Sequence, residues 1–285
     1  MIKIKNIKVN FALMCKGIGI TCVAIANTFA PNAIAQEASC VNFWTNPNTG
    51  KNECFNGRMT VIAEPIPISY NSASDRYNVG GQQISIPNPE SYVRVTPAMG
   101  AVYRLHKSAK DPYSKLLASY ISQSEAEMAM RGELPASTRG FYLKVLKTVE
   151  KESATPQDFA QLKKMIKIEN RKNKSSNLSK LQEIVDESSK SLSQELGVDL
   201  SFDVSEMIPL EPHYESSNTF SYSMYIVSKV SAMGEQTEYV MAGTLTLINV
   251  AGKVVSLYSY GTQADLEWTQ KAGQVWADKA IASNL

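Results

Sequence analysis

The sequence is poor in the residues that catalytic and metal-binding sites most often use. It has two histidines, His106 and His213, and four cysteines without a C-x-x-C pair. It lacks the G-x-S-x-G elbow, the H-E-x-x-H pair and the P-loop, and its Gly80-Gly81 pair is interpreted as a turn. Zinc and iron–sulfur sites need more ligands at closer spacing. The sequence therefore predicts no metal site, no cofactor and none of the common hydrolase constellations.

Long hydrophobic runs are also missing, and the nearest approach to one lies at the N-terminus. A cationic start without acidic residues is supplied by Lys3, Lys5, Lys8 and Lys16. The apolar run that follows, residues 17–26, has about ten residues and is too short to cross a bilayer of roughly 30 Å. Pro31 and the small-x-small site at residues 33–35 complete the pattern of a signal peptide over residues 1–35. We expect a mature chain beginning near Gln36, periplasmic or secreted, from a Gram-negative bacterium.

The mature chain has no excess of charge of either sign. The whole sequence holds 29 Lys and Arg against 27 Asp and Glu. Removing the signal peptide takes away four lysines and no acid, which leaves 25 basic and 27 acidic residues. A nearly neutral chain has no electrostatic preference for nucleic acid or anionic lipid. We therefore predict no nucleic-acid partner, and no membrane span after signal removal.

Two of the four cysteines leave with the signal peptide, and Cys40 and Cys54 remain. In an oxidising compartment a remaining pair indicates one disulfide. It closes a loop of about 15 residues, which is worth roughly 3 kcal/mol in the chain-entropy account. The alternative is that Cys40 is a lipoprotein acceptor, although residues 37–39 lack the usual leucine. Residues 36–78 are thus predicted to be a disulfide-stapled N-terminal segment, arranged as a loop or hairpin.

The clearest structural signal lies near the C-terminus. Residues 219–230, 237–250 and 253–260 are strand-like, and the links between them are short and contain glycine. They predict an antiparallel three-strand meander. One apolar face of its first strand consists of Phe220, Tyr222, Met224, Ile226 and Val230. The second face is less apolar, as expected of a face open to water.

A terminal helix over residues 266–283 follows a capping box formed by Thr262 and Asp265. Its apolar stripe consists of Trp268, Ala272, Val275, Trp276 and Ala280. We expect this stripe to lie across the apolar face of the meander, with the tryptophans in the core and not in a ligand groove. The predicted fold class is α+β, an antiparallel sheet with helices packed on one face.

The earlier part of the same domain, residues 79–285, is less regular. Residues 82–96 predict a hairpin, and residues 141–149 a strand. A short helix is expected from Ser124 to about residue 131. Residues 111–121 fit either a helix or a strand, because short apolar runs cannot be separated by periodicity alone.

A polar helical insert is predicted over residues 155–197. Thr155 and Asp158 form a capping box at its start. The charged and serine-containing run 170–177 then divides it into two helices, and Gly197 ends the second. Because the apolar stripes are narrow, the insert is expected to pack on a surface or as a short antiparallel pair.

The C-terminal region resembles a known family. Residues 249–258 with their Gly252-Lys253 turn, residues 265–268, and a helix ending near Asn284 are similar to the last part of PsbP-like domains. They also resemble a group of uncharacterised exported proteins of Gram-negative bacteria, together with the Ile86-Pro87 strand. The resemblance covers about fifty residues. It implies an accessory or assembly role, because PsbP-like domains are mostly non-enzymatic, but it carries over no residue role, since fold does not fix function.

Three hypotheses for function follow. The leading one is an exported, non-enzymatic protein that binds a protein partner or assists an assembly. Its candidate binding surface is a tyrosine-bearing sheet face made of Tyr222, Tyr225, Tyr239, Tyr258 and Tyr260. The second is a hydrolase using His213, which lies between Glu211 and Glu215, although an exposed loop histidine is the simpler interpretation. The third is an immunity or inhibitor protein.

Overall fold

The computed structural model describes residues 43–45, 52–54, 75–108, 111–172, 178–197, 199–232 and 235–285. The predicted signal peptide and Cys40 lie outside these residues, so export and the disulfide stay predictions. Strands β1 (Phe43–Thr45) and β2 (Asn52–Cys54) pair as an antiparallel hairpin, with Phe43 opposite Cys54.

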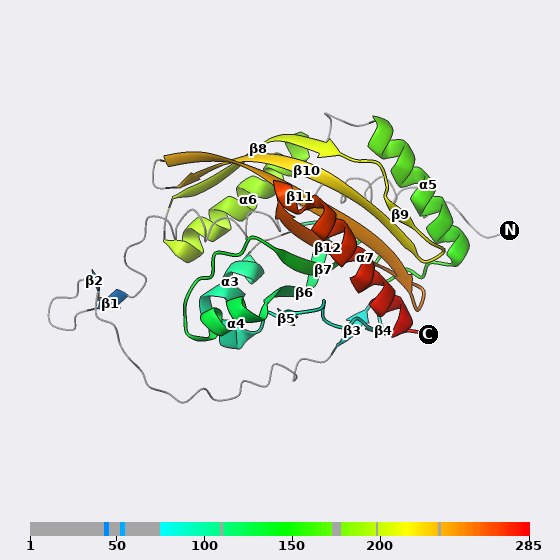
Figure 1. Cartoon of the computed structure of the whole chain (residues 1–285), viewed down its shortest axis with the longest axis horizontal. Helices are drawn as coiled ribbons and strands as arrows, with labels where there is room; N and C mark the ends of the chain where they lie inside the picture. The colour runs from blue at the N-terminus through cyan, green and yellow to red at the C-terminus, as the bar shows by residue number, and fades with distance from the viewer. Residues whose placement is uncertain are drawn as a thin grey trace.

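An eight-stranded antiparallel sheet forms the centre of the main domain (Figure 1). Its order is β5-β6-β7-β12-β11-β10-β8, with β9 also paired to β10. The strands are β5 (Tyr92–Arg94), β6 (Ser114–Ser122), β7 (Gly140–Leu146), β8 (Leu200–Pro209), β9 (Tyr214–Glu215), β10 (Thr219–Ala232), β11 (Glu235–Val250) and β12 (Lys253–Thr262). The α+β class and the C-terminal meander β10-β11-β12 are confirmed.

Helices lie on both faces of this sheet. They are η3 (Pro97–Met99), α3 (Gly100–Ser108), α4 (Gln123–Met130), α5 (Pro156–Lys172), α6 (Leu178–Leu196), η4 (Gln263–Asp265) and α7 (Leu266–Ala282). Helix α7 and the hairpin of β3 (Arg76–Val79) and β4 (Gln82–Ser85) pack on one face. Helices α3, α5 and α6 supply buried side chains to the other. The expectation of helices on one face only is therefore corrected.

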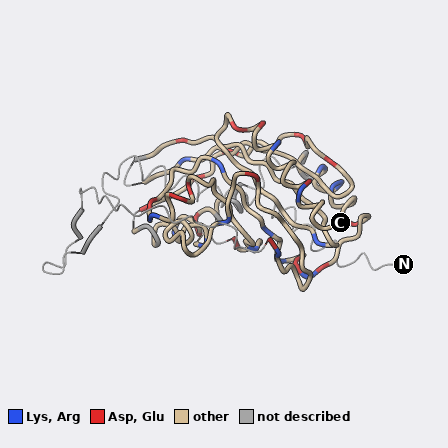
Figure 2. The backbone as a smooth tube through the Cα atoms, turned by 60° about the horizontal axis from the view of Figure 1, so that its bottom comes forward, with Lys and Arg blue, Asp and Glu red and all other residues tan. Residues whose placement is uncertain are grey.

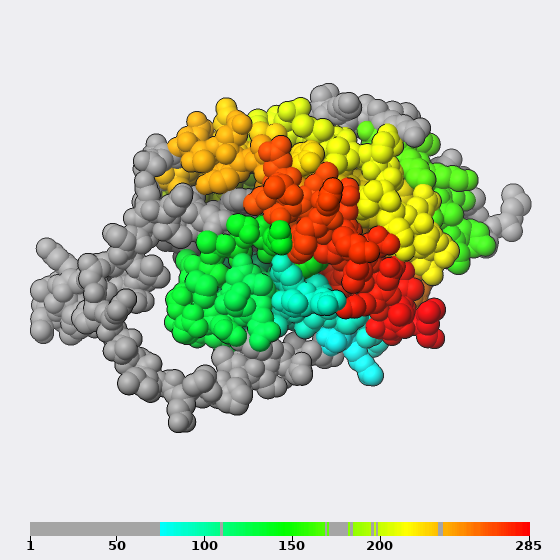
Figure 3. Space-filling view, in the orientation of Figure 1, coloured from blue at the N-terminus to red at the C-terminus, as the bar shows by residue number. Residues whose placement is uncertain are grey.

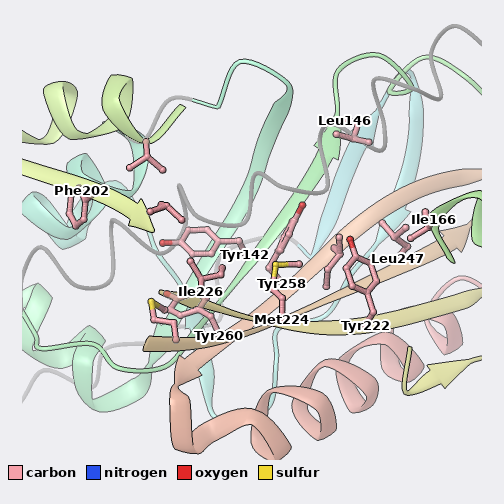
Figure 4. Packing of buried hydrophobic residues seen from close by; sticks show 14 of the residues in the cluster. Tyr142, Leu146, Ile166, Phe202, Tyr222, Met224, Ile226, Leu247, Tyr258 and Tyr260 are labelled. Carbon is pink, nitrogen blue, oxygen red and sulfur yellow. The ribbon is translucent and has the colours of Figure 1, made fainter. Parts of the chain in front are cut away.

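The first core lies between the apolar face of the meander and the helices α3, α5 and α6. The predicted face of β10 is buried there as expected, and the predicted helix residues Phe159, Leu162 and Ile166 of α5 join it. Val185 and Leu192 of α6 are buried in the same cluster. Figure 4 shows aromatic and aliphatic side chains from β7, β10 and β12 gathered on this side of the sheet.

The second core is built around Trp276, which is only 1% exposed. Its indole N–H donates to the carbonyl oxygen of Pro87 at 2.7 Å. The rings of Tyr120 and Phe141 meet it edge-on, each with a centroid distance of 5.3 Å. The predicted core role of Trp276 is confirmed, and Trp268 is partly buried at the margin of this cluster.

Helix α7 covers the opposite face of the meander from the one expected. Its buried line runs through Thr269, Gly273, Trp276, Ala277 and Ala280. Under Thr269 and Gly273 the sheet presents serine and threonine hydroxyls, and a Cβ at Gly273 would lie 3.0 Å from the Ser259 Oγ. Small residues let the helix approach closely enough for these hydroxyls to pair beneath it. The polar face was interpreted as open to water, but α7 covers the part of it around Thr244, Thr246 and Ser259.

The predicted hairpin over residues 82–96 is wrong, although both of its strands exist. β4 pairs with β3 through a turn in which Gly80 and Gly81 have φ of +56° and +91°. β5 pairs with β6 instead. Pro87 and Pro89 between the two strands lack N–H donors, so the chain passes from the hairpin to the sheet without forming a ladder.

The remaining predictions concern single elements and mostly hold. Of the ambiguous residues 111–121, residues 114–121 belong to β6, and the strand predicted over residues 141–149 is β7, which covers residues 140–146 and is buried along its whole length. Helix α5 begins at the predicted capping box: the Thr155 Oγ1 accepts from the Asp158 N–H at 3.2 Å, and Asp158 accepts from the Thr155 N–H at 2.9 Å. Gly197, with φ of +69°, follows α6 as expected.

Amide side chains occupy positions that a neighbouring strand would take at two strand edges. Gln182 of α6 donates to the Phe202 carbonyl oxygen and accepts from the Val204 N–H, both at 2.8 Å. At the far side of the molecule, Asn284 donates to the Ser85 carbonyl oxygen at 2.6 Å and accepts from its N–H at 2.9 Å. Such contacts satisfy edge groups that would otherwise be available for pairing with another chain.

Candidate functional site

The five predicted tyrosines do not share one exposed face. Tyr222, Tyr258 and Tyr260 are buried in the first core, so they cannot form a binding surface. Tyr239 is half-buried and packs against the same cluster. Tyr225 lies on the opposite side of β10 and is half-buried. The reason is parity: side chains alternate along a strand, so Tyr222 and Tyr225 must point to opposite faces.

Tyr225 lies at the base of a part of the sheet that extends beyond the end of β12, here called the arm; it stands opposite Ala242, which is still paired with Gly261 of β12. The pairing of β11 with β12 ends at Met241 opposite Thr262, whereas β10 and β11 stay paired as far as Ala232 opposite Glu235. β8 continues along the other side of β10. The arm is therefore a three-stranded sheet of β8, β10 and β11, and it projects past α7 (Figure 1).

One face of the arm packs on α6. Leu200, Phe202 and Val204 of β8 and Val230 of β10 are buried in the first core with Val185. Ser193 of α6 ties the helix to β8, since its hydroxyl donates to the Leu200 carbonyl oxygen at 2.9 Å and accepts from the Leu200 N–H at 3.1 Å. The arm is thus a two-layer structure with a well-anchored inner side.

The other face of the arm and of its base, here called the arm face, is partly exposed. Its apolar part consists of Ile208, Tyr225, Val227 and Val240. Ile208 is 39% exposed, and the other three are half-buried. In the space-filling view the orange start of β11 lies beside α7 and is not overlaid by it (Figure 3).

A β-bulge decides which residues of β8 reach the arm face. The register shifts so that Val204 lies opposite Ser228 but Glu206 lies opposite Val227, which leaves Ser205 without a residue opposite it in the register. The extra residue reverses the alternation, because Met207 then turns inward while Glu206 and Ile208 turn outward. Sequence alternation alone would place Ile208 on the buried side, so this residue was missed.

Charged residues border the apolar part of the arm face. Reading across the register, Ile208 lies opposite Tyr225, Glu206 opposite Val227, and Lys229 between Asp203 and Glu238. Asp203, Glu206 and Glu238 are exposed. Elsewhere along the described backbone, basic and acidic residues are interspersed (Figure 2). A half-buried aromatic residue with aliphatic neighbours and a charged rim is the composition typical of a protein-binding surface.

The hydroxyl layer under α7 contains the second candidate site, at His213. The His213 Nε2 lies 3.1 Å from the Ser221 Oγ, and Nδ1 lies 3.4 Å from the Ser223 Oγ. Burial lowers the pKa of His213 below its usual value. Ser221 is in turn 2.8 Å from the Thr246 Oγ1. The exposed loop histidine is confirmed, and its ring lies within hydrogen-bond distance of two serine hydroxyls.

This layer is closed to substrate as it stands. Ser221 and Ser223 are fully buried, and Ser223 contacts the Thr244 hydroxyl at 2.7 Å and the Gln270 amide at 3.3 Å. Thr244 pairs with Thr269 of α7 at 2.8 Å. The hydroxyls thus satisfy one another between helix and sheet. Ser221 lies close enough to His213 for the histidine to act as its base in nucleophilic catalysis, but a substrate cannot reach the buried serine hydroxyl.

The first core contains buried ionisable groups that sequence reasoning did not single out. Lys144 contacts the Asp111 Oδ2 at 3.2 Å, and the two side chains are 6% and 5% exposed. The Asp111 Oδ1 also accepts from the backbone N–H groups of Tyr113 and Ser114. Lys144 lies over the rings of Tyr142 and Tyr258 at 5.8 and 5.6 Å. These bonds pin the residues before β6 to the central strand β7, which is a structural role.

His106 is the most strongly perturbed histidine. It is buried and stacks on Tyr142 with a centroid distance of 5.5 Å. Its Nδ1 has no hydrogen-bond partner. Burial lowers the pKa of His106 to about 4, so the ring is neutral at pH 7.

The residues of the resembled C-terminal region have structural explanations. The Lys253 ammonium group donates to the carbonyl oxygens of Glu150 and Glu152 at 3.1 and 2.8 Å. The Asp265 Oδ1 accepts a hydrogen bond from the Arg139 Nε at 3.0 Å, and the Arg139 guanidinium lies 4.8 Å from the Trp268 ring centroid. These contacts fix the β11–β12 turn and the start of α7.

Comparison with known proteins adds no assignment. No family model matches the chain, and no curated protein matches it. Among the described residues there is no group of three His, Cys, Asp or Glu side chains placed to hold a metal ion. The helices in the same part of the chain include none with the length and apolar character needed to cross a membrane.

Proposed function

We propose that the protein is an exported, non-enzymatic binding module that recognises a protein partner through the arm face. One observation carries the proposal: the arm presents the exposed Ile208 beside the half-buried Tyr225, Val227 and Val240, while its other side is anchored on α6. Tyrosine in the middle of such a patch is a frequent energetic hot spot. The signal-peptide pattern and the PsbP-like resemblance of the C-terminal region support export and an accessory role.

A photocrosslinking experiment in the native envelope tests this proposal. The photoreactive residue p-benzoylphenylalanine replaces Tyr225 in one variant and Glu187 in another. Glu187 is exposed on α6, in the opposite layer of the same arm. The proposal expects a discrete adduct of one mass with Tyr225 replaced and none with Glu187 replaced. If neither variant gives an adduct, or both give the same one, the arm face is not the binding surface.

The immunity or inhibitor reading is a special case of this proposal. Such a protein also acts by holding a protein partner, and the arm face would serve that purpose equally. The identity of the crosslinked partner separates the cases: a toxin or an enzyme supports inhibition, and a structural envelope protein supports an assembly role.

A hydrolase remains the second candidate because the Ser221 Oγ lies 3.1 Å from the His213 Nε2. The burial of Ser221 under α7 argues against it. The test is an activity screen of the mature protein with chromogenic esters and peptides, alongside the Ser221→Ala and His213→Ala variants. We expect no turnover in any of the three. Turnover that both substitutions abolish would replace the binding proposal with a hydrolase.

A further inference from the structure

The arm face carries more acidic than basic residues, and its basic residue is already paired with acidic neighbours. Among the described residues of the arm face, Lys229 is the one basic residue. The residues opposite it on the two neighbouring strands, Asp203 and Glu238, are both acidic. Opposite charges directly across a ladder attract each other, so the charge of Lys229 is already compensated within the sheet. One positive charge set against two negative ones leaves this row acidic.

The next row adds a third acid without a counter-charge opposite it. Glu206 is exposed, and its register neighbour is the aliphatic Val227. Val227 in turn lies opposite Val240. The bulge at Ser205 is what turns Glu206 toward this face. The arm face therefore presents a small apolar centre with acidic residues along one side.

We infer that the partner is a protein whose contact surface carries lysine or arginine side chains beside an apolar contact. This inference rests on the proposed function and specifies the chemistry of the partner. Complementary charges accelerate association and suppress wrong partners, and their effect is screened when the ionic strength is raised. An anionic lipid surface or a nucleic acid carries the same sign of charge as this rim and is disfavoured.

Charge reversal in the crosslinking variant tests the inference. The probe is p-benzoylphenylalanine in place of Tyr225, combined with Glu206→Lys and Glu238→Lys. The matched control carries Glu187→Lys, a charge reversal of the same kind on the α6 side of the arm. We expect the adduct yield to fall about tenfold in the double reversal and to stay unchanged in the control. Raising the salt concentration from about 0.05 to about 0.5 M shortens the Debye length about threefold and is expected to lower the yield of the parent probe.

The outcomes separate the two claims. An adduct whose yield is the same in the reversed and parent proteins, with no salt dependence, overturns the basic partner and leaves the proposed function standing. Loss of the adduct in the Glu187→Lys control as well shows a nonspecific charge effect and also overturns the inference. If the parent probe gives no adduct, the proposed function itself fails. Far-ultraviolet circular dichroism and thermal melting of each variant check that the arm is still folded.

Discussion

At the scale of single residues, burial sets the protonation of His106 and so the acid stability of the fold. The pKa of about 4 in the folded state compares with the ordinary value of 6.5. Between these two values the unfolded chain binds a proton that the folded chain does not, so stability falls as the pH drops from about 6.5 to about 4 and then levels off. The shift corresponds to roughly 3 kcal/mol.

Replacing this histidine isolates its contribution. His106→Phe keeps an aromatic ring on Tyr142 and removes the unpartnered Nδ1. We expect the variant to match or exceed the parent in stability at pH 7 and to lose less stability between pH 6.5 and pH 4. Urea unfolding at several pH values measures this difference. His213 is present in both proteins, so equal losses in parent and variant would show that His106 is not the group responsible.

Two aromatic residues test which side chains hold the molecule together. Trp276→Ala leaves a cavity and removes the bond to Pro87, so we expect a loss of about 4 kcal/mol in the free energy of unfolding. Tyr225→Ala on the arm face is expected to cost about 1 kcal/mol or less. Denaturant unfolding compares the two. Similar losses at both positions would mean that Tyr225 is part of the core.

At the scale of elements, Gln182 is predicted to protect the edge of β8. Gln182→Leu keeps the aliphatic part of the side chain but removes both bonds to β8, leaving the Phe202 carbonyl oxygen and the Val204 N–H without this partner. We expect a loss of about 1–3 kcal/mol and faster hydrogen exchange at the Val204 amide. Gln157→Leu, at an exposed position of α5, is the control. Unchanged exchange at Val204 would contradict the edge role.

The elements also show what the sequence could and could not predict. Three features could be predicted from the sequence because each depends on residues close together in the chain. They are the capping box at Thr155, the end of α6 at Gly197 and the meander. The face chosen by α7 was not, since Ser221, Thr244 and Thr246 look like a wet face until a helix supplies their partners. The bulge at Ser205 has no local signature, and it decides the exposure of Ile208. One sequence signal for the arm existed: the second meander strand is longer than the third.

At the scale of the whole molecule, the proposed export places the mature chain in a compartment where a remaining cysteine pair is oxidised. The predicted Cys40–Cys54 disulfide is testable by mass shift after alkylation of protein from the periplasm, with and without reductant. We expect alkylation only after reduction, because one bridge consumes both thiols of the mature chain. Two alkylated cysteines without reductant would contradict the bridge, and a lipid-sized mass increase on Cys40 would establish the lipoprotein alternative.

The most direct test of the central claim asks whether Tyr225 contributes to partner binding without contributing to folding. The photoreactive residue is placed at Val240, which neighbours Tyr225 on the arm face, and the adduct yield is compared with and without Tyr225→Ala. The account predicts that the substitution removes most of the adduct while the melting temperature changes little. An adduct of equal yield in the Tyr225→Ala protein would show that Tyr225 does not contribute to partner binding and would contradict the account.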